Sequence, residues 1–206
     1  MSIDHAELEL FRDNVKRFLE NEIRPHYEQW EKDSWMPREI WHKLGENGLL
    51  CVDQPEQYGG VGVPFQYSMV ILNEMAKMGL ASLATGVSVH SDICAPYIEH
   101  LAQESVKSVW LPKLASGDAV AAIGMTEPGA GSDLAGIRTT AVRDGDFYVV
   151  NGSKTFISNG QHADVVIMAV KTDPAAGSKG VSLLLIDTSL PGFAKGKKLE
   201  KMGLHS

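Results

Sequence analysis

The chain has 206 residues, of which 44% are hydrophobic and 22% charged, the composition of an ordinary globular protein large enough to bury a core. Its formal net charge is −7, and its Lys and Arg residues are interspersed with acids, which argues against a nucleic-acid-binding protein. No apolar run approaches the roughly 20 residues that cross a bilayer, so we expect no membrane span.

The N-terminal stretch and the cysteines favour a cytoplasmic protein. Asp4, Glu7 and Glu9 stand where a targeting signal would carry positive charge. Cys51 and Cys94 lie far apart in apolar surroundings and are predicted to be free, buried thiols in a reducing compartment. The seven histidines show no pair at metal-ligand spacing with a companion acid, so no metal site is predicted.

Up to about residue 120, apolar residues recur at helical spacing. Asp4 is predicted to cap a first helix, with Glu7 as its capping-box partner, and Pro25 should kink or restart that helix. Further helices are expected over 65–78, 80–101 and 105–114, and another from a start within 34–37 to a stop at Asn47-Gly48.

Beyond about residue 120 the apolar period falls to two, which is typical of strands. Helices followed by antiparallel strands predict an α+β protein with a helical domain at 1–120 and a β-domain at 121–206, and they argue against a doubly wound sheet. We expect strands over 119–126, 154–157, 165–171 and 181–187, and a hairpin over 139–150 that turns at Asp144-Gly145.

The most informative segment is IGMTEPGAGSD (123–133), a strand end followed by a glycine-rich loop. Gly129 and Gly131 leave backbone N–H groups accessible, and Thr126 and Ser132 add hydroxyl donors. Such a loop suits an anionic or carbonyl-rich ligand. A turn that only changes the direction of the chain is equally compatible with these residues.

Within this segment, MTEPGAGSD (125–133) resembles a signature of the acyl-CoA dehydrogenase family. The stretch NGSKTFISNG (151–160) is similar to that family's second flavin segment. EQYGGVG (56–62), LPKLASGD (111–118) and the KMG stretch at Gly203 match further landmarks, so the resemblance covers essentially the whole chain. Its detail is closest to the long-chain branch.

The resemblance implies a helical N-terminal domain, a partial antiparallel β-barrel or sandwich domain that binds the flavin ring, and no C-terminal helical domain. It implies FAD-dependent dehydrogenation of long-chain fatty acyl-CoA thioesters to trans-2-enoyl-CoA, as in β-oxidation, with electrons passed to an electron-transferring flavoprotein. Relatives take their catalytic Glu from the C-terminal domain. The resemblance therefore implies no catalytic residue in this chain, which would be inactive alone, and a dimer of dimers for the full-length protein.

The resemblance also implies roles for single residues. Met125 and Thr126 would donate hydrogen bonds to the pyrimidine end of the flavin ring. Phe156 would pack against the ring, and Ser158 would place its hydroxyl near flavin N5. Ser132 would reach the FAD pyrophosphate and the thioester ligand. The residues implied to bind FAD are Ile123, Gly124, Met125, Thr126, Glu127, Pro128, Gly129, Ala130, Gly131, Ser132, Phe156, Ile157 and Ser158, and those implied to bind substrate are Ser132, Ser178 and Lys179.

Alternatives remain for several of these residues. Ser178 and Lys179 also fit a solvated turn, Phe156 fits an ordinary strand aromatic, and Glu127 is better explained as a structural member of its loop. For the whole chain, acyl-CoA oxidases and nitroalkane oxidases share the scaffold and similar flavin loops. A non-catalytic flavin- or acyl-binding subunit that pairs with a separate chain is a further alternative.

Overall fold

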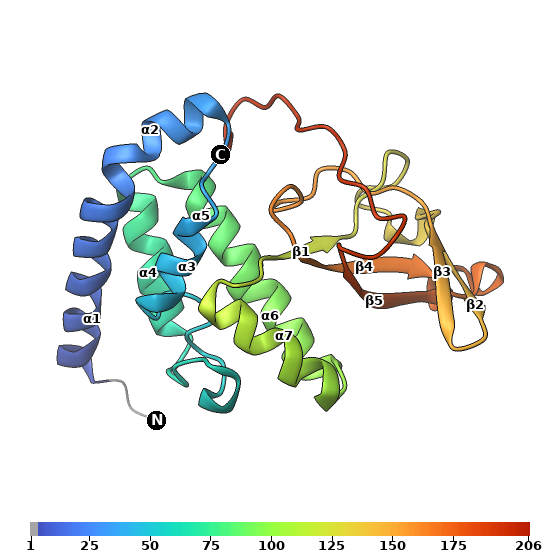
Figure 1. Ribbon diagram of the computed structural model, residues 1–206, viewed down its shortest axis with the longest axis horizontal. Helices are drawn as coiled ribbons and strands as arrows, with labels where there is room; N and C mark the ends of the chain where they lie inside the picture. Colours follow the sequence, from blue (N-terminus) through green and yellow to red (C-terminus); the bar gives the residue numbers. More distant parts are fainter. Residues whose placement is uncertain (1–3) are drawn as a thin grey trace. The chain divides into compact units, whose positions relative to one another are not determined.

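The computed structural model describes residues 4–206 and shows two compact units (Figure 1). The first unit contains the residues up to Val120 together with Glu200–Ser206, and the second contains Ala121–Leu199. Residues 200–206, which we expected in the β-domain, therefore group with the helices.

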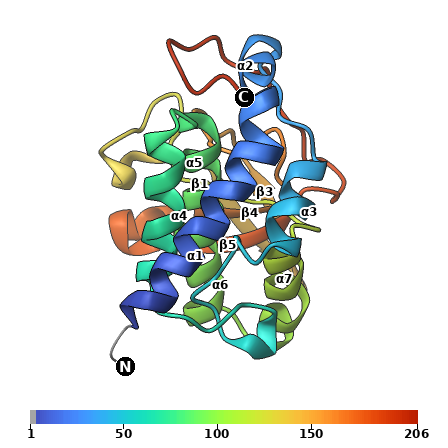
Figure 2. The ribbon, with the colours of Figure 1, turned by 90° about the vertical axis from the view of Figure 1, so that its left-hand side faces the viewer.

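Within residues 4–120, the regular secondary structure of the first unit is helical, as the spacing of its apolar residues predicts. Its core contains Leu19, Trp41, Leu44, Met75 and Leu111, each at most 2% exposed. The first helix packs on α4 (Gln66–Lys77), and α3 (Glu39–Glu46) packs on α7 (Glu104–Ser116) (Figure 2). The helical segments are α1 (His5–Phe18), η1 (Leu19–Ile23), α2 (Arg24–Asp33), α3 (Glu39–Glu46), η2 (Glu56–Tyr58), α4 (Gln66–Lys77), α5 (Ala81–Ser88), η3 (Val89–Cys94), α6 (Ala95–Leu101) and α7 (Glu104–Ser116).

Capping and proline chemistry explain where these helices begin and change. The predicted N-cap is confirmed, because Asp4 Oδ1 accepts a hydrogen bond from Ala6 N at 2.8 Å. Pro25 has the predicted effect: the helix widens into the π-helical segment η1 and restarts as α2. A proline offers no N–H to the preceding turn, and a wider turn relieves its clash. Pro96 follows η3 in the same way, so the single helix predicted over 80–101 is three consecutive pieces.

The second unit is built on one five-stranded sheet with β4 (Val165–Lys171) at its centre. One edge of β4 pairs with β5 (Val181–Asp187), and the other pairs first with β1 (Ala121–Gly124) and then, at one position, with β2 (Thr140–Asp144). The strands are β1 (Ala121–Gly124), β2 (Thr140–Asp144), β3 (Phe147–Asn151), β4 (Val165–Lys171) and β5 (Val181–Asp187), and short 3₁₀ segments lie at η4 (Leu134–Gly136) and η5 (Pro174–Gly180).

The expectation of an antiparallel domain is wrong for two of the four strand pairs. The pairs β2–β3 and β4–β5 are antiparallel, whereas β1–β4 and β2–β4 are parallel, so the sheet is mixed. A parallel pair needs a long connection, and the chain between β1 and β4 provides one, since it includes a loop and the whole β2–β3 hairpin. The α+β class itself is confirmed.

Two local expectations in this unit also need correction. Asp144 pairs with Phe147, so the hairpin turns at Gly145 and Asp146, one residue later than predicted. Gly145 has a φ of 60°, which explains why a glycine stands at the first turn position. Phe156 is not in a strand, because residues 152–158 have no β-pairing.

The structure describes the two cysteines and the lengths of the helices, on which two of the expectations depend. Cys51 and Cys94 are free and buried, which confirms that part of the expectation. Burial raises the pKa of the Cys94 thiol to about 12 and also raises the pKa of Cys51. Among residues 4–206, no helix is both long and apolar enough to serve as a membrane span.

The returning segment 200–206 is held to the helical unit through one carboxylate on α2. Glu31 accepts hydrogen bonds from His205 N and Ser206 N, both at 3.2 Å, and from the Ser206 hydroxyl. Burial alone would raise the pKa of this carboxyl, but the hydrogen bonds from Ser206, Ser82 and His205 lower it to about 2. The segment is therefore attached by charge-assisted hydrogen bonds.

Two glycines at helix ends allow a matched test of packing. Gly79 and Gly117 have nearly equal φ values of 75° and 78°, but a Cβ at Gly79 would meet open space, whereas one at Gly117 would lie 2.1 Å from Trp41 O. We expect Gly79→Ala to lower the free energy of unfolding by about 1–2 kcal/mol through backbone strain alone. Gly117→Ala should cost about 2–4 kcal/mol, because the clash adds to the strain. Urea denaturation measures both, and equal losses would contradict the close packing of α7 on α3.

Candidate functional site

The glycine-rich loop leaves the sheet at the end of β1 and closes on itself. Glu127 N donates to Ala130 O at 2.9 Å, and Ala130 N donates to Glu127 O at 3.1 Å, so residues 127–130 form a tight turn. Met125 packs on a small cluster of Ala130, Ile137 and Ala169. The two ends of the turn, Glu127 and Ala130, are thereby fixed and buried, while Pro128 and Gly129 between them are exposed.

The second predicted flavin segment lies beside this loop although it is distant in the sequence. Thr155 N donates to Thr126 O at 2.9 Å. Asn159 Nδ2 donates to Ala121 O at 3.2 Å, which ties the far end of the segment to β1. Ile157 packs against the buried cluster that includes Ala122 and Val166. The structure therefore brings together the two groups of residues that the resemblance implied for FAD, 123–132 and 156–158.

A buried ion pair joins the glycine-rich loop to the second predicted flavin segment. Lys154 Nζ lies 2.8 Å from Glu127 Oε1, and the two side chains are 5% and 6% exposed. The Glu127 carboxylate also accepts hydrogen bonds from Arg138 N at 2.6 Å and Thr139 N at 3.0 Å. Burial alone would raise the pKa of this carboxyl, but the hydrogen bonds from Lys154 and from the backbone of Arg138 and Thr139 lower it to about 2. Glu127 is thus a structural residue, as the sequence indicated.

The outer surface of the loop is open to a ligand. A Cβ on Gly129 or Gly131 would meet nothing within 4 Å, and neither residue has a positive φ. Among residues 4–206, no neighbour therefore requires glycine at these positions, and an approaching ligand is a sufficient reason for it. Pro128 and Ser132 are exposed beside them. The arrangement can donate backbone and hydroxyl hydrogen bonds to an acceptor-rich ligand.

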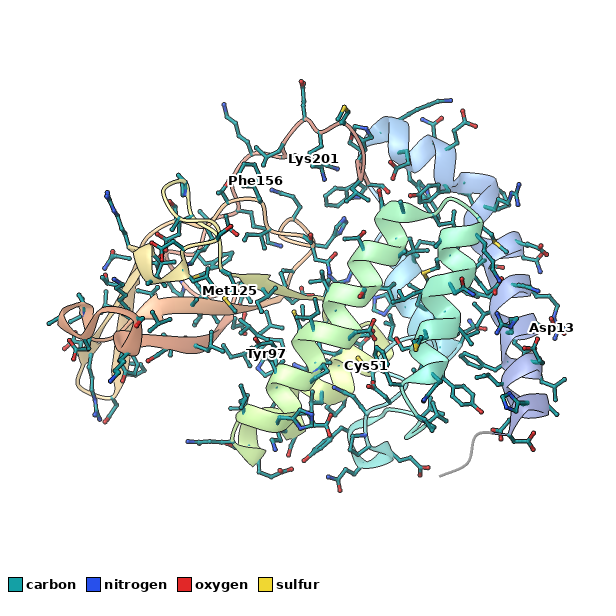
Figure 3. All side chains as sticks on the ribbon, turned by 180° about the vertical axis from the view of Figure 1, so that it is seen from behind. Asp13, Cys51, Tyr97, Met125, Phe156 and Lys201 are labelled. Atoms are coloured by element: carbon teal, nitrogen blue, oxygen red, sulfur yellow. The ribbon has the colours of Figure 1, made fainter. Side chains whose placement is uncertain are left out.

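Phe156 is a large apolar side chain of the site that is mostly exposed to solvent. It is 74% exposed, and its φ of 57° lies in the left-handed region, where a bulky residue costs about 1–3 kcal/mol. Figure 3 labels Phe156 on the loop that follows β3, and Met125 just beyond the end of β1. An aromatic ring held out of the core by strained backbone is suited to stacking on another flat group.

The remaining predicted residues lie nearby or on the next loop. Ile123 and Gly124 are the last two residues of β1, and Ser158 is exposed two residues beyond Phe156. Ser178 and Lys179 are exposed on η5, which packs against η4, the short helix that follows the glycine-rich loop. Their role in substrate binding stays a prediction.

Two residues that position the site were not predicted from the sequence. Lys154 and Asn159 both lie inside the segment 151–160 that carried the resemblance, on either side of Phe156. Each reaches back to β1 or to the loop after it. A lysine three residues after a strand ordinarily indicates a solvated surface, so its burial could not be foreseen.

The ion pair predicts a specific dependence of stability on pH. Glu127→Gln should lower the free energy of unfolding at pH 7 by about 3–5 kcal/mol, since it leaves the Lys154 cation buried without its partner. The folded pKa of Glu127 is depressed to about 2 from 4.5. The stability that it contributes is therefore present above pH 4.5 and is lost as the pH falls towards 2.

Urea denaturation of both proteins between pH 2 and pH 7 measures this difference. The gap between the unaltered chain and Glu127→Gln should close as the pH falls through that window. A gap that stays constant down to pH 2 would contradict the ion pair.

Comparison with known proteins agrees with this geometry. Residues 5–118 match the family described as "Acyl-CoA dehydrogenase, N-terminal domain", and residues 122–206 match "Acyl-CoA dehydrogenase, middle domain". The chain is 41% identical over 203 residues to the mitochondrial long-chain specific acyl-CoA dehydrogenase of Sus scrofa, an alignment that covers 98% of this chain and 47% of that protein.

Two solved structures show the same fold. An acyl-CoA dehydrogenase from Geobacillus kaustophilus is 51% identical with a TM-score of 0.95, over 99% of this chain and 53% of that one. A glutaryl-CoA dehydrogenase from Mycobacterium smegmatis, in complex with FADH2, is 30% identical with a TM-score of 0.90, over 99% and 51%. The chain spans about half the length of the relatives it matches. Because the two family descriptions together match nearly all of its residues, the chain belongs to the acyl-CoA dehydrogenase family.

Proposed function

We propose that this chain forms the flavin-ring half of an acyl-CoA dehydrogenase that oxidises long-chain fatty acyl-CoA thioesters to trans-2-enoyl-CoA. The observation that supports it most is the convergence of residues 123–132 and 156–158 on one exposed surface, through the hydrogen bond from Thr155 N to Thr126 O. The preference for long chains is supported by the 41% identity to the long-chain specific enzyme of Sus scrofa.

The residues present fit FAD. Open space at Gly129 and Gly131 leaves room for a bulky anion against the loop, and the exposed Phe156 offers a flat apolar surface to the ring. Met125 and Thr126 would meet the pyrimidine end of the ring with hydrogen-bond donors, and Ser132 would meet the pyrophosphate. Ser158 would hold its hydroxyl near flavin N5. When bound, FAD would supply the acceptor for the hydride that leaves the β-carbon of the thioester.

We assign the general base of this reaction to none of the acidic residues of the site. Removal of a proton next to a thioester needs a carboxylate that is free to accept it. Glu127, the buried acid of the loop, is held by Lys154 and by two backbone N–H groups, and its pKa is lowered to about 2. We infer that the base comes from a part of the enzyme outside these residues. An electron-transferring flavoprotein as acceptor and a homo-oligomeric assembly belong to the same proposal.

An anaerobic visible spectrum separates binding from chemistry. Added FAD should show a perturbed, protein-bound flavin band, and a long-chain acyl-CoA added afterwards should not bleach it, because Glu127 is not free to accept the proton. Bleaching would show that this chain carries its own base and would contradict that part of the proposal. A spectrum identical to free FAD would contradict the flavin half-site.

Phe156 and Phe147 provide a matched pair for testing the ring surface. Both are exposed phenylalanines of the same unit, 74% and 77% exposed, but Phe147 lies on the β2–β3 hairpin. Phe156→Ala should weaken FAD binding about tenfold, the loss of about 1.4 kcal/mol expected from one aromatic contact, and Phe147→Ala should leave it unchanged. Fluorescence titration of FAD measures both affinities. Equal effects of the two substitutions would contradict the role of Phe156.

A further inference from the structure

Lys154 lies two residues before Phe156, and its side chain contacts the glycine-rich loop that forms the other part of the candidate flavin surface. Its Nζ donates to Met125 O at 3.1 Å and to Glu127 Oε1 at 2.8 Å. The next residue, Thr155, donates its N–H to Thr126 O. Two consecutive residues of one segment are thereby bonded to three consecutive residues of the other. This arrangement fixes the offset between the two segments as well as their distance.

The chain accommodates this lysine at a cost. A cation withdrawn from water to 5% exposure loses hydration that only a well-placed partner can offset. The aliphatic part of Lys154 runs beside Gly124, where a Cβ would lie 3.4 Å from Lys154 Cγ, in van der Waals contact. The burial of the cation indicates that this side chain has a required position and is not a surface lysine that happens to be covered.

The ion pair leaves no net charge under the loop. Glu127 neutralises Lys154, and its carboxylate is further saturated by the N–H groups of Arg138 and Thr139. Lys154 is therefore poorly suited to bind an anion directly. Its contacts instead set the backbone direction of residues 125–127, which determines where the donors of Met125 and Thr126 point.

We propose that Lys154 is a positioning residue that holds the hydrogen-bonding loop at 125–127 in register with the aromatic segment at 156–158. This proposal rests on the proposed function, because the register matters only if one flat ligand contacts both segments. Lys154 sets the angle between the hydrogen-bond donors at one end of the ring and the stacking surface of Phe156. Its loss alters the geometry of a bound flavin and not only its affinity.

The test compares Lys154→Met with Lys197→Met, the removal of an exposed lysine of the same unit that has no predicted role in binding. Amide hydrogen exchange is followed in the chain without added flavin. Lys154→Met should speed exchange at the Thr155 amide at least tenfold, and Lys197→Met should leave it unchanged. The double variant Lys154→Met with Glu127→Gln should exchange no faster at Thr155 than Lys154→Met alone, because the two residues form one ion pair and their effects are not additive.

A second readout uses FAD. Lys154→Met should weaken FAD binding at least tenfold, and at saturation it should shift the visible absorption band of the bound flavin relative to the unaltered chain. Lys154→Arg keeps the cation while changing its reach and shape. It should restore slow exchange at Thr155 but not the original flavin band. If Lys154→Met does not fold, Lys154→Arg alone tests the proposal. A shifted flavin band in Lys154→Arg supports positioning by the lysine, and an unshifted band shows that the cation only balances the charge of Glu127.

Some results would overturn the proposal. Exchange at Thr155 that is the same in Lys154→Met and Lys197→Met would show that Lys154 does not hold the two segments. An unshifted flavin band in both Lys154 variants would show that it does not set the ring geometry. If the unaltered chain binds no FAD, the proposed function fails, and the exchange measurement by itself decides whether Lys154 joins the segments.

Discussion

The shape of the glycine-rich loop depends on a pair of opposite charges that is almost completely removed from water. Two ions in a medium of low polarity attract strongly, but each has lost its hydration, so the pair is favourable only with good geometry and additional hydrogen bonds. Glu127 meets that condition, since it accepts from Lys154 Nζ and from two backbone N–H groups. The pair replaces the regular hydrogen bonding that a strand or helix would give to this stretch. The loop is consequently shaped before any ligand arrives.

The preformed loop determines which groups can stabilise charge at the site. The lysine is neutralised by its partner, so the surface around Gly129 and Gly131 acts through N–H dipoles and hydroxyl groups rather than through a full cation. Oriented dipoles stabilise charge that develops during a reaction without having to reorganise. In the proposed function this suits a flavin ring that becomes more negative at one end. The strained, exposed Phe156 complements those dipoles with an apolar surface.

Local sequence patterns predicted most of the fold because most of it is determined locally. Apolar spacing gave the helices, Pro25 marked a true interruption, and the strands over 165–171 and 181–187 have the predicted bounds. The direction of β1 against β4 could not be predicted, because alternation with a period of two is the same in parallel and antiparallel strands. Direction depends on where a long connection returns, which no local pattern records.

In the candidate site, too, local motifs could be predicted from the sequence, whereas long-range contacts could not. The resemblance indicated segments 123–132 and 156–158, and the structure places them side by side. The buried partner of Glu127 could not be read from the sequence, since lysines are usually solvated and this contact spans the whole β2–β3 hairpin. The left-handed backbone of Phe156 was equally hidden, because aromatic residues ordinarily avoid it.

The return of residues 200–206 to the helical unit makes that unit discontinuous along the chain. During synthesis the N-terminal helices emerge first, but the contacts of Glu31 with His205 and Ser206 have to wait until the entire sheet unit has left the ribosome. The sheet unit is, in effect, an insertion between two parts of its neighbour, tethered at both ends. A single proteolytic cut near residue 199 would therefore leave the sheet unit covalently joined to the helices, whereas a cut near residue 120 would leave it attached only through the hydrogen bonds that residues 205 and 206 make with Glu31.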